Sequence, residues 1–282
     1  MKDRRIMPLL WLSWNCRYNN QDFKYQEKDI KQMNTIKRFG MVMTLLASSA
    51  SYAASLPVPD PLLKMSKVTS ATKQANMTPK QALQRLKEGN LRFVGAQMKQ
   101  RNFLAQAKQS SYGQYPWAII LNCMDSRSVP ELFFDQGLAD LFILRVAGNV
   151  LSDDLLGSME YATKAVGTPL IVVLGHTSCG AVAGACQGVR LGHLDNVLDK
   201  IKPVVAQSQK EAGTDNCGHD ALLNEIAKNN ALRAAAQVRE QSPIISELIA
   251  KGKVGVVAGI HDIKTGKVTF FEEGRLLPEG KN

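Results

Sequence analysis

The 282-residue chain has few cysteines, few aromatic residues and no long apolar run. Its five cysteines are too few for the disulfide framework of a small secreted domain. Because no apolar stretch reaches the roughly 18 residues that a transmembrane helix needs, we expect no stable membrane span. Hydrophobic residues make up 45% and charged residues 21% of the chain, which excludes a disordered, collagen-like or coiled-coil protein. The sequence predicts a globular protein with a large core.

The net charge of +10 lacks the clustering that is typical of a nucleic-acid-binding surface. Residues 1–53 hold 9 basic and 4 acidic side chains and so account for half of the excess. The other half is dispersed over residues 54–282, where no basic run alternates with aromatic side chains. We therefore expect no nucleic-acid partner.

The segment 33–53 has the pattern of a secretory signal peptide. Two basic side chains precede a short apolar stretch over 41–47, and small residues precede a cleavage point after Ala53. An amphipathic or core helix is the alternative interpretation. Because a signal peptide normally begins a chain, residues 1–32 are interpreted as an upstream extension or a mistaken start. Cleavage near Ala53 predicts a periplasmic or secreted protein.

The rest of the chain divides into a leader and one domain. Residues 54–77 contain several prolines and then a polar stretch, which predicts a leader and linker. At Thr78 and Pro79 the pattern changes, because Thr is a preferred N-cap and Pro is favoured at the first helical position. An apolar stripe then predicts a helix that ends near Gly95. We expect one domain over residues 78–282.

Apolar segments of strand length alternate with helical segments along this domain. The predicted strands cover residues 116–122, 141–146, 170–174 and 254–258, followed by a strand-turn-strand around 264–267. The predicted helices cover 130–135 and 155–166, a stretch after Gly180, and two stretches within 221–250. Uniformly apolar strands that alternate with helices indicate an α/β fold with a mostly parallel sheet, covered by helices on both faces.

Two polar motifs follow directly after predicted strands, where open α/β sheets place their sites. The first is C-x-D-x-R at residues 123–127, and the second is H-x-x-C-G at residues 176–180. At adjacent strand ends, Cys123, His176 and Cys179 offer two thiolates and one imidazole, which suit a Zn²⁺ ion and leave its fourth position open. Taken singly, a buried cysteine is usually a small hydrophobe, so the zinc prediction depends on both motifs together.

The first motif also contains a carboxylate and a guanidinium. Asp125 and Arg127 lie two residues apart, so both side chains can face the same side of an extended turn. Asp125 could fill the fourth zinc position itself, or pair with Arg127 and leave that position to water. In the second state zinc lowers the pKa of the water toward about 7, and Asp125 orients the resulting hydroxide. An ordinary ion pair in a turn is the alternative.

The two motifs, with Cys123 and His176 53 residues apart, resemble those of the β-class carbonic anhydrases. The likeness extends from Thr78 to the C-terminus. It implies one Zn²⁺ per subunit and reversible hydration of carbon dioxide to bicarbonate and a proton, by a zinc-bound hydroxide that Asp125 and Arg127 orient. It also implies a parallel sheet with a terminal antiparallel strand, a homodimer that can pair into a tetramer, and an N-terminal helical arm packed on the neighbouring subunit.

The resemblance further assigns residues to the substrate pocket. Gln114, nine positions before Cys123, matches a glutamine that reaches the pocket, and Phe142 matches a pocket phenylalanine. Tyr161 matches a tyrosine near the dimer interface, and Gly180 follows the second zinc cysteine in the same pocket. Each of the three side chains, taken alone, would more often pack in the core, and their joint spacing favours the pocket.

Two positions depart from the family pattern. Val146 stands after Arg145, where the family often has Asn. Ile120 stands three positions before Cys123, where relatives with a regulatory bicarbonate site usually have Trp. We therefore expect no such regulatory pocket and a zinc site that is open to water at neutral pH.

Three rival functions use parts of the same pattern. A hydrolase of carbon disulfide or carbonyl sulfide on this scaffold would use the same zinc ligands. A non-catalytic zinc or redox module would have a closed four-ligand site and no use for Arg127. A nucleotide-binding domain is disfavoured, because Ala181 and Val182 follow the glycine-containing turn where a phosphate loop requires Lys and Ser or Thr.

The remaining cysteines and histidines are not predicted ligands. Cys186 is expected to be a small buried residue, and Cys217 lies in a polar turn. An oxidising compartment would allow the two to join, but the sequence gives no distance between them. His193, His219 and His261 are expected to be solvated or capping side chains.

Overall fold

The computed structural model describes residues 67–278 of the chain. The segments predicted as an upstream extension (1–32) and a signal peptide (33–53) lie outside the described residues, as does most of the predicted leader. Within the described range, no helix is both long enough and apolar enough to cross a membrane.

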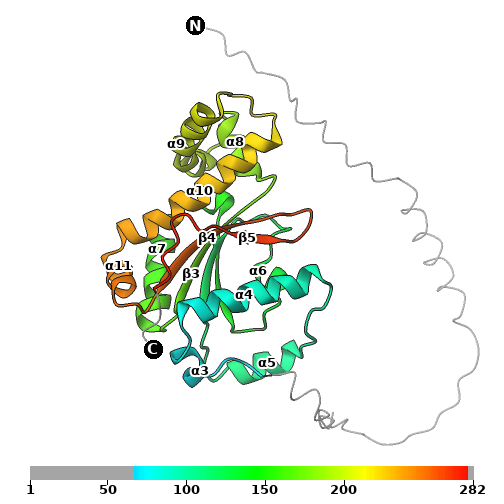
Figure 1. Cartoon of the computed structure of the whole chain (residues 1–282), viewed down its shortest axis with the longest axis vertical. Helices are drawn as coiled ribbons and strands as arrows, with labels where there is room; N and C mark the ends of the chain where they lie inside the picture. Colours follow the sequence, from blue (N-terminus) through cyan, green and yellow to red (C-terminus); the bar gives the residue numbers. More distant parts are fainter. Residues whose placement is uncertain (1–66, 279–282) are drawn as a thin grey trace, which may run out of the picture. The chain divides into compact units, whose positions relative to one another are not determined.

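The domain is built on a five-stranded sheet with the strand order β2-β1-β3-β4-β5. Figure 1 shows β3, β4 and β5 of this sheet. The strands are β1 (Ala118–Asn122), β2 (Leu141–Arg145), β3 (Leu170–His176), β4 (Gly255–His261) and β5 (Val268–Phe270). β1 to β4 pair in parallel, and β5 pairs antiparallel with β4. The predicted α/β fold, with a mostly parallel sheet and a terminal antiparallel strand, is confirmed.

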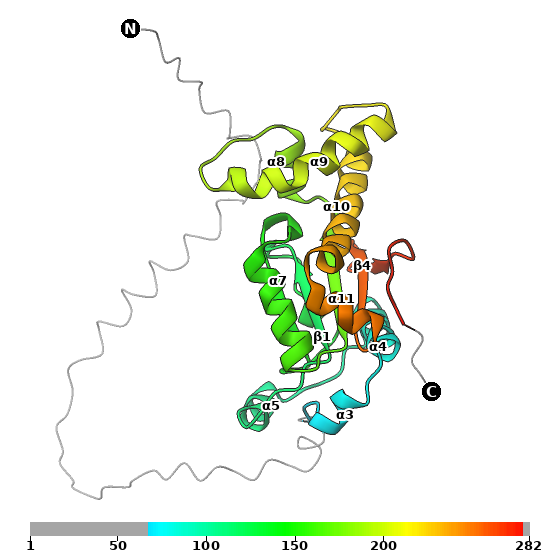
Figure 2. The same ribbon diagram turned by 90° about the vertical axis from the view of Figure 1, so that its left-hand side faces the viewer.

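Helices cover both faces of the sheet, and Figure 2 shows α7 and α4 on opposite sides of the strands. The helices are α3 (Ala71–Ala75), α4 (Pro79–Val94), α5 (Phe103–Ser110), α6 (Pro130–Phe133), α7 (Asp153–Glu160), α8 (Gly180–Cys186), α9 (Leu194–Ala212), α10 (Asp220–Gln241) and α11 (Pro243–Ala250). A π-helical turn (Tyr161–Ala165) continues α7, and a 3₁₀ turn, η2 (Ala147–Asn149), follows β2.

Side chains that alternate along the strands create two apolar layers. Ile119 and Ile171 pack on the side of α7, α10 and α11. Ile120 and Val172 pack on the opposite side, with α4 and α6. A third apolar cluster joins α8, α9 and α10 at one end of the domain and includes Cys123. The end of β1 therefore meets this helical cluster.

Helix α4 begins as the sequence predicts. The Thr78 hydroxyl accepts a hydrogen bond from the Gln81 N–H at 3.2 Å, and the Gln81 side chain accepts one from the Thr78 N–H at 2.9 Å. This reciprocal capping fixes the start of the helix. Leu83 and Leu86 are then buried in the same cluster as Trp117. α4 thus packs on its own sheet, and the packing of a helical arm on a second subunit stays a prediction.

Three helices were not predicted from the sequence. α9 contains Pro203, which removes one helical hydrogen bond, and α5 is a short helix with a single buried residue.

The third of these helices, α3, lies in the stretch predicted as a linker. There the buried Gln74 donates to the Pro116 carbonyl at 2.7 Å, and Thr69 donates to Asp140 at 2.6 Å. These two side-chain hydrogen bonds attach residues 69–75 to the domain.

A disulfide joins Cys186, at the end of α8, to Cys217, in the loop before α10. Their Cα atoms lie 5.8 Å apart, and 31 positions separate them in the sequence. The sequence left this pairing open because it gives no distance between the two turns. In the structure, residues 187–193 lead away from Cys186 and α9 returns the chain, so that Gln209 near its end lies 3.7 Å from the sulfur atoms of both cysteines.

Candidate metal site at the carboxyl edge of the sheet

Three candidate metal ligands meet at the carboxyl edge of the sheet. Cys123 directly follows β1, His176 ends β3, and Cys179 is the N-cap of α8. β1 and β3 are parallel neighbours, so both motifs reach the same edge. The ligand atoms of the three residues lie within 4.8 Å of one another, and all three residues are buried. Both thiols are free.

The turn within the second motif brings its two ligands to one point. Ser178 takes the left-handed conformation, with φ +55°, which reverses the chain between His176 and Cys179. The Thr177 N–H donates to the His261 carbonyl at 3.0 Å, and the Thr177 hydroxyl accepts from the Ile263 N–H at 3.0 Å. The turn is therefore held by the end of β4 and the residues that follow it.

His176 is oriented as a metal-binding imidazole. Its Nδ1 lies 2.9 Å from the Thr177 carbonyl, so Nδ1 carries the proton and Nε2 keeps its lone pair. The Nε2 atom is buried and has no hydrogen-bond partner within residues 67–278. A buried polar atom without a partner is costly. A cation beside Nε2 and two thiolates removes that cost, so the residues present fit Zn²⁺.

The two thiols and the imidazole compete for protons. The neighbouring Cys179 thiol, together with the nearby His176 and the Gly148 N–H at 3.3 Å, lowers the pKa of the Cys123 thiol against the effect of burial. The Cys123 thiolate and burial raise the pKa of Cys179. Burial lowers the pKa of His176, but the neighbouring thiolate outweighs it and raises the value. Because a metal ion takes the place of these protons, the cluster is suited to bind one.

Asp125 and Arg127 form a two-pronged ion pair beside the cluster. Asp125 Oδ1 accepts from Arg127 Nε at 2.9 Å and from the Arg127 N–H at 2.9 Å, and Oδ2 accepts from Arg127 Nη2 at 2.7 Å. Hydrogen bonding from Arg127 lowers the pKa of Asp125 to about 2 despite partial burial. Asp125 is half-buried and Arg127 exposed, so the carboxylate is ionised and accessible at neutral pH.

Arg145 holds the loop that carries this pair, a role that the sequence did not reveal. Its guanidinium donates to the carbonyls of Cys123 at 3.2 Å, Asp125 at 2.6 Å and Ser128 at 3.1 Å. Val146, the departure from the family pattern, bonds through its backbone N–H to the Asn122 carbonyl at 3.2 Å. Since this contact uses no side chain, the identity of residue 146 does not affect it.

Most of the residues predicted for the substrate pocket lie apart from the candidate metal ligands within one chain. Phe142 pairs with Ile119 near the start of β1, whereas Cys123 follows the end of that strand. Gln114 precedes β1 and is exposed, and Tyr161 begins the π-helical turn with 60% of its surface exposed. The described part of one chain does not gather these three beside the ligands. Gly180, by contrast, directly follows Cys179 as the first residue of α8.

One of the remaining histidines differs from its prediction. His261 is 3% exposed, its Nδ1 lies 3.2 Å from the Ser128 hydroxyl, and its ring stacks on Phe133. Burial, with a smaller effect of His176, lowers its pKa to about 4, so it is neutral at neutral pH. The expectation of a solvated or capping side chain is wrong for His261. His193 and His219 are exposed at the N-caps of α9 and α10.

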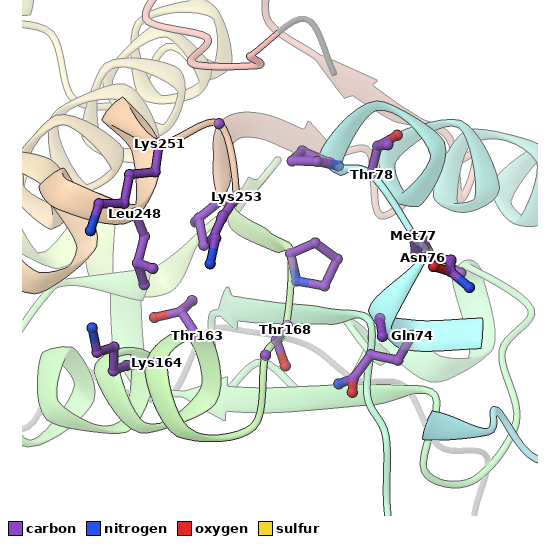
Figure 3. A pocket seen from close by; sticks show the side chains of 16 residues that line it. Gln74, Asn76, Met77, Thr78, Thr163, Lys164, Thr168, Leu248, Lys251 and Lys253 are labelled. Carbon is purple, nitrogen blue, oxygen red and sulfur yellow. The ribbon is translucent and has the colours of Figure 1, made fainter. Parts of the chain in front are cut away.

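A cavity of about 560 Å³ lies at the opposite, amino edge of the sheet (Figure 3). It is bordered by the residues that lead into β3 and β4, and Lys164, Lys251 and Lys253 surround one side of it. The buried side chains in its wall already have partners, since Gln74 and Thr168 both donate to the Pro116 carbonyl. Despite its size, this cavity contains none of the predicted site residues.

The chain is similar to known enzymes over the region that holds the motifs. A family model described as carbonic anhydrase matches residues 118–268. Carbonic anhydrase 2 of Mycobacterium tuberculosis is 34% identical over 201 residues, which cover 69% of this chain and 94% of that protein. The chain belongs to the carbonic anhydrase family. A carbonic anhydrase of Mycolicibacterium smegmatis is also 34% identical, over 68% of this chain and 93% of the relative.

Solved structures define the class within the family. The chain resembles a β-carbonic anhydrase of Sordaria macrospora, described as tetrameric, with a TM-score of 0.55 and 26% identity over 59% of this chain and 85% of that one. The fold and the curated relatives together make the protein a β-class carbonic anhydrase enzyme. The Cys-His-Cys cluster at the carboxyl edge is the part of the structure suited to hold its metal.

Proposed function

We propose that the protein catalyses the reversible hydration of carbon dioxide to bicarbonate and a proton, with a Zn²⁺ ion held by Cys123, His176 and Cys179. The observation that carries the proposal is the convergence of these three ligand atoms within 4.8 Å, with His176 Nε2 buried and without a partner among the described residues. A bound Zn²⁺ lowers the pKa of a water from about 15.7 to about 7 and so supplies a nucleophile at neutral pH.

Asp125 and Arg127 would orient the attacking water. Asp125 Oδ2 accepts one hydrogen bond from Arg127, and a carboxylate oxygen has room for a second. The water would donate that second bond to Asp125, which directs its lone pair toward the carbon of the substrate. The paired donors of Arg127 also restrain the Asp125 carboxylate from turning toward the metal ligands. This pairing supports an open site, which the non-catalytic zinc module would not need.

A second copy of the chain would complete the substrate pocket. β2 is one of the two edge strands of the sheet, and large apolar side chains are exposed near it, including Met124 at 64% and Leu138 at 41%. An apolar surface beside an open strand edge is suited to a homodimer. Such a dimer would bury Tyr161 and bring Gln114 and Phe142 toward a ligand cluster. Sedimentation analysis is expected to show a dimer or tetramer. A protein that stays monomeric at high concentration would contradict this arrangement.

We also propose a periplasmic or secreted location, with cleavage near Ala53. The disulfide between Cys186 and Cys217 supports this location, because disulfides persist in oxidising compartments. N-terminal sequencing of the protein from the periplasm of an expressing bacterium tests the proposal. A product that begins near residue 54 is expected. A full-length product that stays in the cytoplasm would contradict it.

Stopped-flow hydration of carbon dioxide by the full chain tests the proposed reaction. The same preparation is given carbonyl sulfide, the substrate of the nearest rival enzyme. Rapid hydration, with slow or no release of sulfide, is expected. Rapid release of sulfide with slow hydration would overturn the proposal and leave the fold and the zinc ligands in place.

A further inference from the structure

The 3₁₀ turn after β2 connects the metal site to helix α10. The Gly148 N–H donates to Cys123 Sγ at 3.3 Å, and the Gly148 carbonyl accepts a hydrogen bond from Asn230 Nδ2 at 2.7 Å. Asn230 lies in α10, 82 positions further along the chain, and is 3% exposed. Two hydrogen bonds thus lead from α10, through one glycine, to a predicted metal ligand.

The structure leaves Gly148 little freedom. Its φ of +67° is in the left-handed region, which favours glycine. A Cβ atom at this position would lie 2.7 Å from Ile201 Cδ1 and 3.1 Å from Ala181 Cβ. The turn is therefore enclosed by α8 and α9. Within this space the Asn230 amide is hydrogen-bonded to the Gly148 carbonyl.

Asn230 occupies a position where the helix pattern favours an apolar residue. The buried face of α10 includes Ile226, Ala227, Ala231 and Ala234, which precede and follow Asn230 at helical spacing. A buried amide is tolerated in such a face when it has a hydrogen-bond partner. Since the partner is the Gly148 carbonyl, the amide acts on the 3₁₀ turn more than on helix packing.

We propose that Asn230 is a positioning residue for the metal centre. By holding the Gly148 carbonyl, Asn230 aims the Gly148 N–H at Cys123 Sγ, and this hydrogen bond slows the loss of the metal ion. The inference rests on the proposed zinc site. Hydrogen bonds to the ligands of a metal commonly change its affinity 10- to 100-fold.

The test compares two substitutions on the same helix in the full chain. N230L is similar in shape and removes the donor to Gly148. The matched control is N229L, which removes a 3.0 Å hydrogen bond from Asn229 to the Ser208 hydroxyl and so loosens α10 from α9 without a link to Gly148. Each zinc-loaded protein is mixed with excess chelator and the release of zinc is followed. N230L should release zinc at least about tenfold faster than wild type, and N229L should stay within about twofold of it.

A spectroscopic readout separates positioning from a general loss of stability. In the Co²⁺-substituted protein, the sulfur-to-cobalt band should move to longer wavelength in N230L, because a thiolate without this hydrogen bond donates electrons more readily. The band should not move in N229L. A purely structural role would lower the unfolding temperatures of both metal-free variants and leave both bands in place.

The outcomes distinguish this inference from the proposed function. A wild-type protein that binds no zinc overturns both. A wild-type protein that binds zinc, with unchanged release and an unchanged cobalt band in N230L, overturns the role of Asn230 alone. If N230L does not fold, N230A is measured in its place against the same expectation, and an unchanged N230A overturns the role equally.

Discussion

The two edges of the sheet differ in what their polar groups do. At the amino edge, the cavity of about 560 Å³ has buried walls in which Gln74 and Thr168 are already hydrogen-bonded. At the carboxyl edge, His176 Nε2 has no partner among residues 67–278, and two free thiols lie beside it. A buried atom without a partner is not sufficient, since Arg85 Nη1 near the amino edge has none among the described residues either. The comparison shows that an unpartnered imidazole nitrogen beside two free thiols, rather than the size of a cavity, marks the functional edge of this domain.

Two carboxylates that lie ten residues apart in the sequence also differ in their surroundings. Asp125 pairs with Arg127, is half-buried, and keeps room to accept a further hydrogen bond. Asp135 is fully buried and accepts from both Arg92, at 2.5 Å, and Arg101. Asp125 is therefore accessible for the proposed role, whereas Asp135 holds α4 and the loop after it against the turn that follows α6.

The largest expected effect comes from removing a metal ligand. C179S should lower the zinc content from about one ion per chain to near none. Hydration should then fall at least about a thousandfold, because the proposed source of the nucleophile at neutral pH is lost with the metal. Metal analysis and stopped-flow assays of the same sample check both. Full hydration activity in a zinc-free C179S protein would show that the activity does not depend on a metal at the carboxyl edge.

Removing the carboxylate beside the ligands should have the next largest effect. D125N should keep its zinc and lose hydration activity about 100-fold or more, since an amide orients the water poorly. The control is D199N, which removes an exposed carboxylate that lies 3.1 Å from Arg190. It should retain wild-type activity. A fully active D125N would favour an ordinary turn ion pair.

Asp135 should affect stability and leave zinc binding intact. Burial raises its pKa, but hydrogen bonds from Arg101 and Arg92 outweigh burial and lower the pKa below the usual value. Its stabilising contribution is therefore present above about pH 4 and is lost as the pH falls through the lower value of the folded state. D135N should lower the free energy of unfolding by about 3 kcal/mol at pH 7, because it leaves two arginines without their partner.

Urea unfolding of wild type and D135N from pH 7 down to pH 3 checks this prediction. The difference between the two proteins should shrink below about pH 4. A difference that stays constant over this range would show that the Asp135 charge is not the source of the stability. Loss of zinc from folded D135N would contradict the prediction that Asp135 affects stability and leaves zinc binding intact.

The smallest expected effect lies at the amino edge. K164A and K253A change two lysines that surround the cavity shown in Figure 3. Their hydration rates should stay within about twofold of wild type, because neither residue lies near the ligand cluster. Stopped-flow assays under the conditions used for D125N provide the comparison. A tenfold loss in either variant would give the amino edge a part in the reaction.

Much of the fold could be predicted because its signals are local in the sequence. Residues 118–121 and 170–174 are uniformly apolar, and Thr78 caps α4 with a residue only three positions away. The three ligands could be predicted to meet because each lies at or just after the end of a strand of a parallel sheet, and parallel strands end at one edge. Sequence spacing and elementary sheet geometry are sufficient for this part of the site.

The rest depends on contacts between distant parts of the chain. Asn230 reaches Gly148 across 82 positions, and Cys186 meets Cys217 only because α9 returns the chain to the end of α8. α9 itself was missed, since Pro203 inside a helix runs against local preference. His261 illustrates the same limit, because its burial depends on Phe133. Such tertiary effects leave no local pattern in the sequence.

The central claim is that the cluster at the carboxyl edge holds a Zn²⁺ ion on which hydration depends. The most direct test measures hydration by the full chain as isolated, after removal of the metal by a chelator, and after return of one equivalent of Zn²⁺. The account predicts loss of activity in the second state and its recovery in the third. Activity that persists without the metal, or that stays absent although the ion has bound again, would contradict it.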